Sequence, residues 1–581
     1  MSLQVQGVAY VHPDKEPLFQ NISFTVQQGE KCAIIGNNGI GKSTLLSIMA
    51  GKTACAAGTV ACDSTPYLIP QHFGQYDSMT VAEALGVAEK MAAMEAILGG
   101  QGTEHDFTLL NDEWDIEDRL AEAFARWHLN GMSPCTPMGK LSGGEKTKAF
   151  LAGLNVFQPS VVLMDEPTNH LDATGRSLLN EFVSQTNRTV VVVSHDRTLL
   201  DMMPAIYEMS ASGMKYYPMS YNMYKETVDA ENAAKAARLQ NRQKELKKAE
   251  MSAQRAMERQ QKHASRGEKL SAKKCVARIA MGNMRDKSEA SASRLNKMQQ
   301  EKLTDMKQDL NAAQTELHKL PEMKLDIGNP TMPANKLLVE TTDVTFGYPG
   351  REPLWQRSPL SISLYSGERV WLRGDNGYGK STLIKLLTGA LNPTSGNVRR
   401  SQTLNIVCLD QEYSLIDDKQ TVYTQLEAYN GKRPEHELKM LLNRFSLTAA
   451  SWNKKCAFLS GGERMKLALC CLLVCEDAPD MIIADEPTNN IDISSMDVLA
   501  ATLSTYTGTL LIVSHDKQFI QDIGIDRTIS IRQEAAGPGH PYHHIGNERG
   551  AGVCHGLISC RHDTRESSIH NLRRHDGKIY L

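Results

Sequence analysis

Two glycine-rich stretches carry the residue types that hold the phosphates of a nucleotide. Each reads Gly-x-x-x-x-Gly-Lys-Ser, at residues 36–43 and 374–381, and precedes a helical pattern. Small residues let backbone N–H groups approach phosphates, the lysine neutralises the β- and γ-phosphates, and the serine holds Mg²⁺. Because the match occurs twice in the same context, we predict two ATP sites. The predicted nucleotide contacts are Gly36, Asn37, Asn38, Gly39, Ile40, Gly41, Lys42, Ser43, Thr44, Gly374, Asp375, Asn376, Gly377, Tyr378, Gly379, Lys380, Ser381 and Thr382.

An acidic pair follows an apolar run in each half of the chain. The run VVLMDEPTNHLD contains Asp165 and Glu166, and MIIADEPTNNID contains Asp485 and Glu486. We expect the aspartate to reach Mg²⁺ through water and the glutamate to polarise the attacking water, as a catalytic residue. An isolated acidic pair would merely mark the end of a strand. Two pairs that follow phosphate loops at the right distance favour catalysis.

Other polar residues recur at the same offsets. The histidines of two SHD motifs, His195 and His515, are 320 residues apart, as are the two glutamates, and we predict that they sense the γ-phosphate. A lone histidine is more often structural. Gln71 and Gln411 each follow a short apolar run, and their side chains are candidates to coordinate Mg²⁺ or the water. The predicted metal ligands are Ser43, Gln71, Asp165, Ser381, Gln411 and Asp485.

Two LSGGE motifs have the form of a second anion site, since a serine and two glycines open a helix. Each half already has its own phosphate loop. The simplest arrangement is therefore a head-to-tail pairing within one chain, in which Ser142 completes the site around Lys380 and Ser460 completes the site around Lys42. This pairing predicts two composite sites in a monomer. The signature residues assigned to the nucleotide are Ser142, Gly143, Gly144, Ser460, Gly461 and Gly462.

The motifs recur in the same order, and the elements that must position them repeat as well. Runs such as VVVVS and LLIVS predict strands buried on both faces of a mostly parallel sheet, with helices between them. The predicted fold class is α/β, with two tandem P-loop ATP-binding cassettes at residues 1–224 and 336–532. Gln71 and Gln411 are 340 residues apart, but the two LSGGE motifs are only 318 residues apart. The first cassette therefore carries about 22 extra residues between its glutamine and its LSGGE motif. We expect this arm at about 89–119.

Residues 225–335 are predicted to form an α-helical hairpin linker. Between 225 and 319 aromatic residues and proline are absent, and residues 242–297 contain 16 Lys and Arg against 6 Asp and Glu. Such composition favours exposed helices. A solvated spacer and a surface that binds a polyanion are both compatible with it. The hairpin is expected to break near 263–267 or at 282–283.

The 581 residues have a net charge of only −3 and contain no apolar stretch of membrane-spanning length. The N-terminus lacks the basic start and long apolar run of a secretory signal. We therefore expect a cytoplasmic protein of two or three domains without an obligate membrane domain. Residues 533–581 hold 7 of the 17 histidines, show no periodicity, and are predicted to be a disordered tail.

Taken together, the motifs resemble the ATP-binding cassette superfamily. The two fused cassettes, the charged linker, the arm and DEPTNHLD look like the ABC-F family, over roughly residues 1–532. The resemblance implies an ATPase that uses ATP and Mg²⁺, with nucleotide contacts from the D-loop residues Asp172 and Asp492. It also implies that Tyr348 stacks on adenine. In the first half His12 stands at the matching position, with Tyr10 nearby, which departs from the family pattern.

The family resemblance implies the ribosome, with its rRNA and tRNA, as the partner. Some members regulate translation, and others relieve the inhibition that ribosome-targeting antibiotics cause. A basic hairpin suits the phosphate backbone of RNA. Two alternatives share the ATP chemistry. The nucleotide-binding subunit of a transporter has no evident need for the basic linker. A DNA-associated repair ATPase would have much longer coils or a C-terminal coiled coil.

Overall fold

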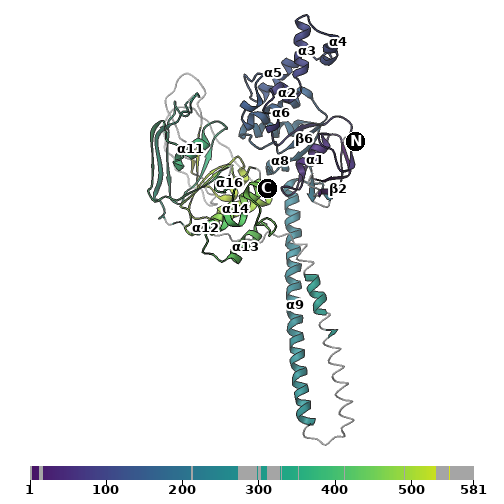
Figure 1. The fold of residues 1–581 in the computed structure, drawn as a ribbon, viewed down its shortest axis with the longest axis vertical. Coiled ribbons are helices and arrows are strands. Elements are labelled where there is room, and N and C mark those ends of the chain that lie inside the picture. Colours follow the sequence, from purple (N-terminus) through teal and green to yellow (C-terminus); the bar gives the residue numbers. More distant parts are fainter. Residues whose placement is uncertain are drawn as a thin grey trace, which may run out of the picture.

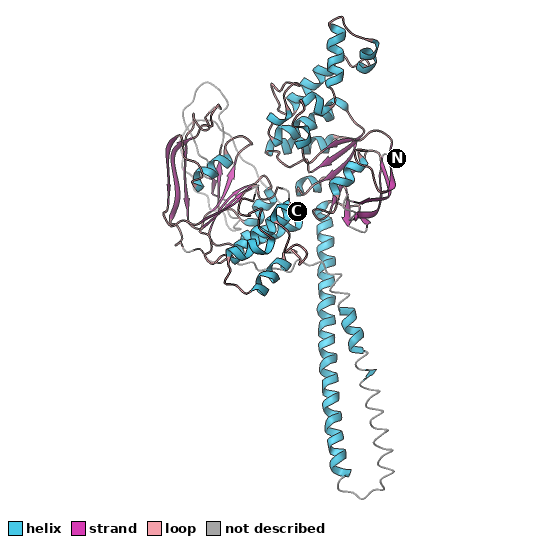
Figure 2. Cartoon of the chain, in the orientation of Figure 1, coloured by secondary structure: helices cyan, strands magenta, loops and turns pink. Residues whose placement is uncertain are grey.

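In a computed structural model of the chain, two α/β cassettes lie at one end of a long helix (Figure 1). The described residues are 3–11, 17–210, 213–271, 297–298, 302–310, 327–328, 330, 332–350, 353–410, 413–445, 447–489, 491–531 and 548–549. Each cassette combines strands with helices, as the colours of Figure 2 show. The predicted fold class, α/β with two tandem cassettes, is confirmed.

The first cassette is built on a six-stranded sheet with the order β5-β6-β7-β3-β8-β9, in which only β9 is antiparallel to its neighbour. A smaller antiparallel sheet has the order β2-β1-β4. The strands are β1 (Leu3–Val11), β2 (Pro17–Val26), β3 (Lys31–Ile35), β4 (Ala57–Cys62), β5 (Tyr67–Ile69), β6 (Val161–Asp165), β7 (Thr189–Val193), β8 (Ala205–Ser210) and β9 (Gly213–Tyr217). The helices are α1 (Lys42–Met49), α2 (Val81–Leu85), α3 (Ala88–Leu98), α4 (Glu104–Leu110), α5 (Ile116–Arg126), α6 (Gly143–Phe157), α7 (Ala173–Gln185) and α8 (Arg197–Asp201), with 3₁₀ turns at Gly74–Tyr76 and Met138–Lys140.

The second cassette repeats this architecture. Its larger sheet has the order β14-β15-β16-β12-β17-β18, and its smaller sheet the order β11-β10-β13. The strands are β10 (Leu337–Thr345), β11 (Leu360–Tyr365), β12 (Arg369–Arg373), β13 (Ser395–Arg400), β14 (Ile406–Leu409), β15 (Met481–Asp485), β16 (Thr509–Val513), β17 (Arg527–Ser530) and β18 (Glu548–Arg549). The helices are α11 (Lys380–Thr388), α12 (Val422–Tyr429), α13 (Glu435–Arg444), α14 (Gly461–Val474), α15 (Ile493–Thr505) and α16 (Lys517–Ile523), with a 3₁₀ turn at Cys456–Phe458.

The central strands of both larger sheets are buried on both faces. Every residue of β6, β7, β15 and β16 is buried. These strands read as continuous apolar runs because helices cover a parallel sheet from both sides. Asp165 pairs with Val193, and Asp485 pairs with Val513. Each acidic pair and the SHD motif of the same cassette are therefore brought together at the carboxyl edge of the sheet.

The long helix α9 (Tyr221–Ser271) leaves the first cassette and extends away from both (Figure 1). A helical segment at 302–310 runs beside it: Arg242 donates to the backbone carbonyl of Asp309 at 3.1 Å, and Lys307 lies 3.3 Å from Glu250. These contacts are those of two antiparallel helices. The helices α3 and α4, which occupy the segment predicted as an arm, project from the opposite end of the first cassette.

One of the two expected breaks in the linker is wrong. The helix α9 continues through residues 263–267 to Ser271. A single glycine inside a helix costs only about 1 kcal/mol relative to alanine, and the strong helix formers around Gly267 outweigh it. The other expected break, at 282–283, lies outside the described residues, as do residues 533–547 and 550–581 of the predicted tail. In the parts of the chain that are described, no helix is long and apolar enough to cross a membrane.

Candidate active site

The first phosphate loop joins β3 to α1. Gly41 has φ 101° at the N-cap of α1, and a Cβ there would lie 2.7 Å from the ring of Phe19, so only glycine fits. The Nζ atom of Lys42 donates to the carbonyls of Gly36 at 2.7 Å and Asn37 at 3.1 Å. Burial lowers the pKa of Lys42. The loop thus curls around a buried ammonium group at a helix N-terminus, which favours a polyanion.

The second phosphate loop has the same construction. Gly379 has φ 85°, and a Cβ would lie 2.6 Å from the ring of Trp355. The Nζ atom of Lys380 donates to the carbonyls of Gly374 at 2.7 Å and Asp375 at 3.2 Å. Burial lowers the pKa of this lysine as well. The predicted contacts of both loops therefore lie around equivalent cradles.

The two glutamates that follow the buried strands have strained backbones. Glu166 has φ 47° and Glu486 has φ 50°, in the left-handed region that L-residues rarely adopt. Backbone hydrogen bonds hold this conformation, from the N–H of Glu166 to Val193 at 2.8 Å and from that of Glu486 to Val513 at 2.9 Å. Strain of this kind occurs at functional sites. Here it occurs twice, at the residues predicted to act on water.

Burial dominates the electrostatics of the four carboxyl groups. It raises the pKa of Asp165 to about 6, against a hydrogen bond with Ser43 that lowers it, and it raises the pKa of Asp485. It also raises the pKa of Glu166, with Asp165 adding to the rise. The pKa of Glu486 is raised by burial to about 7. Carboxyl groups with such values titrate near neutral pH, as a general base must.

Each SHD histidine faces the glutamate of its own cassette. Nε2 of His195 lies 3.4 Å from Oε1 of Glu166 and 3.0 Å from Oδ1 of Asn38, and Nε2 of His515 lies 3.2 Å from Oε1 of Glu486. Burial lowers the pKa of both histidines to about 3. The imidazoles are therefore neutral at physiological pH.

The first nucleotide site combines residues from both cassettes. A cavity of about 520 Å³ is lined by Lys42, Glu166 and His195 of the first cassette and by Ser460 and Gly461 of the second. Gln71, Ser43 and Asp165 also line it. Across the same boundary, the N–H of Asn38 lies 3.5 Å from Oδ2 of Asp492, which is a long hydrogen bond.

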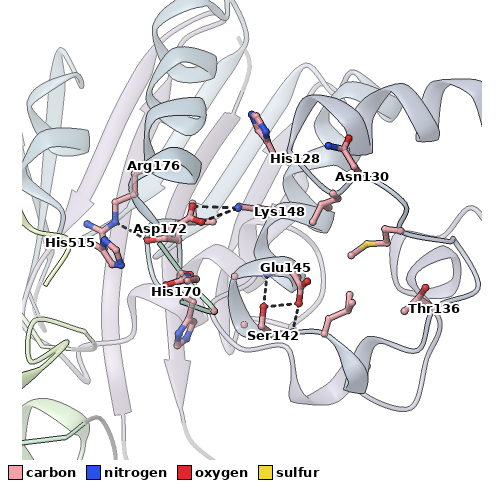
Figure 3. Close-up of a pocket in the computed structure, with 18 of the residues that line it drawn as sticks. His128, Asn130, Thr136, Ser142, Glu145, Lys148, His170, Asp172, Arg176 and His515 are labelled. Carbon is pink, nitrogen blue, oxygen red and sulfur yellow. Dashed lines mark hydrogen bonds and ion pairs between the residues drawn. The ribbon is translucent and has the colours of Figure 1, made fainter. Parts of the chain in front are cut away.

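The second site is composite in the same way. A cavity of about 480 Å³ holds Lys380, Ser381 and Asp485, and an adjoining cavity of about 740 Å³ brings Ser142 to the side of Glu486. Figure 3 shows Ser142, Asp172 and His515 around the larger cavity. Nδ2 of Asn376 donates to the carbonyl of His170 across the boundary at 2.6 Å. Ser460 and Lys42 thus line one cavity, whereas Ser142 lines a cavity that adjoins the cavity of Lys380.

The signature serines are N-caps. Ser142 accepts a hydrogen bond from the N–H of Glu145 at 3.3 Å, and Ser460 accepts one from that of Glu463 at the same distance. Each glutamate in turn accepts from the N–H of its serine, which makes a capping box. The caps begin α6 and α14 at the cavities, so the helix N-termini face the nucleotide sites. Gly143, Gly144, Gly461 and Gly462 form the first turns of these helices.

Four further predicted site residues remain: two have described positions, and two lie outside the described residues. Tyr348 lines the cavity at Lys380, is 38% exposed, and its hydroxyl lies 3.1 Å from that of Thr382, so its ring is available at the rim. Its stacking on adenine stays a prediction. His12 and Gln411 lie outside the described residues. Asp172 caps α7 and lies 3.3 Å from Lys148.

Sequence reasoning missed several residues that line the second site. His170, Lys148 and Arg176 all face the cavity of about 740 Å³. His170 stands in DEPTNHLD itself, so its position beside the D-loop was a usable signal. Arg176 stands where the second half has Met496, and this difference between the repeats was the only signal in the sequence.

The donors at both sites fit Mg²⁺ together with a nucleotide triphosphate. Oδ1 of Asp165 is buried without a hydrogen-bond partner among the described residues, and the serine of the phosphate loop is beside it. A carboxylate and a hydroxyl are oxygen ligands that Mg²⁺ prefers, with the phosphates supplying the rest. Ser381 and Asp485 repeat this pair. Within the described residues, no cluster of three or more His, Cys, Asp or Glu offers a metal site made by protein alone.

Comparison with known proteins agrees with this geometry. The family model described as "ABC transporter" matches residues 19–169 and 358–489, one match in each cassette. Among solved structures, that of the complex of archaeal ribosomal stalk protein aP1 and archaeal ribosome recycling factor aABCE1 superposes with a TM-score of 0.55. It is 17% identical in sequence and covers 91% of this chain and 88% of that one. At this identity the likeness supports the fold alone.

Curated relatives match over most of the chain. The putative ATP-binding protein YdiF of Bacillus subtilis (strain 168) is 30% identical over 538 residues, which are 87% of this chain and 77% of YdiF. The ribosome protection protein VmlR of the same strain is 29% identical and covers 89% of this chain and 84% of VmlR. The energy-dependent translational throttle protein EttA of Escherichia coli (strain K12) is 27% identical, with 89% and 90% covered. The chain therefore belongs to the ABC-F family of the ATP-binding cassette superfamily.

Proposed function

We propose that the protein hydrolyses ATP in its two composite sites and uses the cycle to bind and leave the ribosome, as a translation factor or a ribosome protection factor. The observation that carries the ATPase part is the meeting of a phosphate loop, an acidic pair and an opposing signature serine at each site. The names of EttA and VmlR support the ribosomal part. A ribosomal partner places the protein in the cytoplasm.

Each site has groups for every part of the hydrolysis. Lys42 and Lys380 hold the β- and γ-phosphates, and the N-termini of α6 and α14 supply N–H groups from the opposite cassette. Glu166 and Glu486 take the proton from the water whose oxygen attacks the γ-phosphorus. As that bond forms, the bond from the γ-phosphorus to the bridging oxygen breaks, and ADP leaves with its electrons. The neutral histidines lie beside these glutamates and sense the γ-phosphate.

Mg²⁺ held by the Ser43–Asp165 and Ser381–Asp485 pairs would neutralise charge on the phosphates when bound. Gln71 faces the first site from the end of β5 and completes the donor set there. The protein's own contribution is positional. Because the cavities include residues from both cassettes, the sites are complete only when the cassettes are together, so ATP favours the closed arrangement.

The helix α9 presents a basic surface. In residues 235–259 eight exposed cations stand against three acidic residues. The less exposed positions include Ala236, Leu239, Leu246 and Ala253, whose spacings of three and seven residues place them in one stripe. The stripe suits packing against another helix, and the exposed cations other than Arg242, which donates to Asp309, are available to a polyanion. The cations are Lys235, Arg238, Arg242, Lys244, Lys247, Lys248, Arg255 and Arg259.

Sedimentation with ribosomes tests the proposal. The variant Glu166→Gln with Glu486→Gln keeps the nucleotide cradles but removes both bases, so in ATP it is expected to pellet with ribosomes and not to be released. In ADP it should stay in the supernatant. Absence from the ribosomal pellet in ATP would contradict the proposal.

A second variant separates the basic helix from the cassettes. Replacing Lys244, Lys247, Lys248 and Arg255 by glutamine should weaken ribosome binding. The slope of the logarithm of the binding constant against the logarithm of salt concentration should fall by about one for each lost phosphate contact. The matched control replaces four exposed lysines of the second cassette by glutamine, Lys419, Lys432, Lys454 and Lys455. Equal losses in the two variants would argue against α9 as the RNA-binding element. Copurification with a membrane protein, or tight duplex-DNA binding at physiological salt, would favour the alternatives.

A further inference from the structure

The two composite sites differ in the residue that the opposite cassette adds beside the catalytic glutamate. Arg176 lies near the start of α7, after the D-loop of the first cassette. At the offset of 320 residues that relates the acidic pairs, the second cassette has Met496 on α15. A permanent cation thus corresponds to an apolar side chain at otherwise matching positions.

The position of Arg176 is held at an electrostatic cost. A cation near the N-terminus of a helix is repelled by the helix dipole. Arg176 is nevertheless largely buried, with 15% of its side chain exposed. Its Nη1 donates to Oδ2 of Asp196 at 2.8 Å, and its Nε donates to the carbonyl of Leu171 at 3.2 Å. Two directed contacts fix the guanidinium, which leaves further N–H groups for the cavity.

The guanidinium faces the nucleotide site of the other cassette. Arg176 lines the cavity of about 740 Å³ together with Glu486 and His515, and Figure 3 shows it beside His515. Burial raises the pKa of Glu486, and Arg176 is the strongest opposing influence, ahead of Lys380. The same charge contributes to the lowered pKa of His515, after burial and Lys380. The electrostatic reach of Arg176 therefore extends across the boundary between the cassettes.

The first site lacks this contribution. Met496 lines a small cavity of about 20 Å³ with Glu166 and His195, which Arg176 also touches. The pKa of Glu166 is raised by burial and by Asp165, and lowered mainly by Lys42. Burial, Lys42 and Asp492 account for the pKa of His195. Arg176 lines the cavity of about 740 Å³ at the second site but not the cavity of about 520 Å³ at the first, so its charge is placed mainly at the second site.

We propose that Arg176 is a positioning residue that acts across the cassette boundary: it gives the second composite site a fixed positive charge that the first site lacks, so that the second site hydrolyses ATP faster. This inference rests on the proposed ATPase function. Negative charge accumulates around the γ-phosphoryl group and the glutamate during hydrolysis, and a fixed cation beside them stabilises it. The closed cassettes bring the charge into place, which ties turnover at the second site to closure.

Single-site enzymes test the inference. Glu166→Gln leaves only the second site competent, and Glu486→Gln leaves only the first. In the first of these backgrounds Arg176→Met is expected to lower kcat roughly tenfold or more, with KM for ATP changed less than kcat. Arg176→Lys, which keeps the charge, should restore part of the rate. In the other background Arg176→Met should change kcat by less than about twofold.

The reciprocal change gives an independent readout. Met496→Arg should raise kcat of the first site in the Glu486→Gln background, and Met496→Leu is its matched control. Thermal unfolding and ATP binding by each variant check that the cassettes remain folded.

Two failures are distinguishable. Loss of kcat to the same extent in both single-site backgrounds, with no rescue by lysine, would assign Arg176 a structural role through Asp196 and overturn the inference alone. Absence of ATP hydrolysis by the wild-type chain would overturn the proposed function and the inference with it.

Discussion

The two composite sites match on the side of the phosphate loop and diverge on the side of the opposite cassette. Both have a buried lysine folded against its loop and a glutamate with φ near 50°, and both have a neutral histidine beside that glutamate. Arg176 lines the large cavity of the second site with Glu486, whereas at the first site Arg176 and Met496 line only a small cavity beside Glu166. The loop and strand that bind and activate are thus repeated faithfully. The variation lies where two cassettes must meet.

The ion pairs across the boundary between the cassettes are also distributed unevenly. Arg197 of α8 donates to Asp522 at 3.0 Å and also pairs with Asp497 of α15, while Lys225 at the start of α9 lies 3.4 Å from Asp497. The counterpart of Arg197 in the second cassette, Lys517, is exposed. The side of the boundary next to α9 is therefore tied by charge. Lys225 thus connects the base of α9 to this boundary through Asp497.

The largest effect is expected from replacing the catalytic glutamate, which both sites have. The double variant Glu166→Gln with Glu486→Gln should lower ATP hydrolysis roughly 10²- to 10⁴-fold, because a general base contributes about that much. Phosphate release measures the rate, and equilibrium binding of ATP should be retained. The single variants then give the share of each site. A double variant with near wild-type turnover would mean that neither glutamate is the base.

The next largest effect is expected from variants that disturb the signature serine which one cassette adds to the site of the other. Ser142→Arg places a long cation in the cavity of the second site, and Ser460→Arg does so at the first. In the Glu166→Gln background, where only the second site turns over, Ser142→Arg should lower phosphate release roughly a hundredfold. Ser460→Arg should have a much smaller effect there, and the order should reverse in the Glu486→Gln background. Loss that follows the serine of the same cassette would contradict composite sites.

The chemistry of each half could be predicted from sequence because it is local. The acidic pair must follow a buried strand, and the phosphate loop must open a helix, so the motif and its secondary structure are read together. The pairing of Ser142 with the second site followed from a count of anion sites. The structure places Ser142 on a cavity with Glu486, next to the cavity of Lys380, and places Ser460 on one cavity with Lys42.

The contacts between cassettes could not be predicted in this way. Arg176 and Glu486 are 310 residues apart, and Arg197 and Asp497 are 300 apart. Whether such side chains meet depends on how two domains are placed, and no periodicity or propensity carries that information. The extent of α9 depends on a balance of small local free energies, in which one glycine does not end a helix. A comparison of the two repeats, position by position, would have singled out Arg176 against Met496.

A smaller effect is expected at the tied side of the boundary. Arg197→Ala removes the contacts to Asp497 and Asp522, which are themselves 46% and 34% exposed. Such partly exposed pairs are worth roughly 1 kcal/mol or less, so KM for ATP should rise about two- to fivefold as closure becomes harder. Lys517→Ala is the matched control and should leave KM unchanged. Equal effects of the two variants would show that Arg197 contributes no more than Lys517 to holding the cassettes together in solution.

The smallest effect is a difference in pH dependence between the sites. Each glutamate must be ionised to accept a proton, so kcat/KM rises with pH and falls below the pKa of the free enzyme. Glu486 has a pKa raised by burial to about 7, and burial together with the charge of Asp165 raises the pKa of Glu166 further. The second site, measured in Glu166→Gln, should therefore reach half of its maximal kcat/KM near pH 7, and the first site, measured in Glu486→Gln, at a higher pH. Arg176→Met should move the midpoint of the second site upward, and coincident or reversed profiles would show that the charge of Arg176 does not distinguish the two sites.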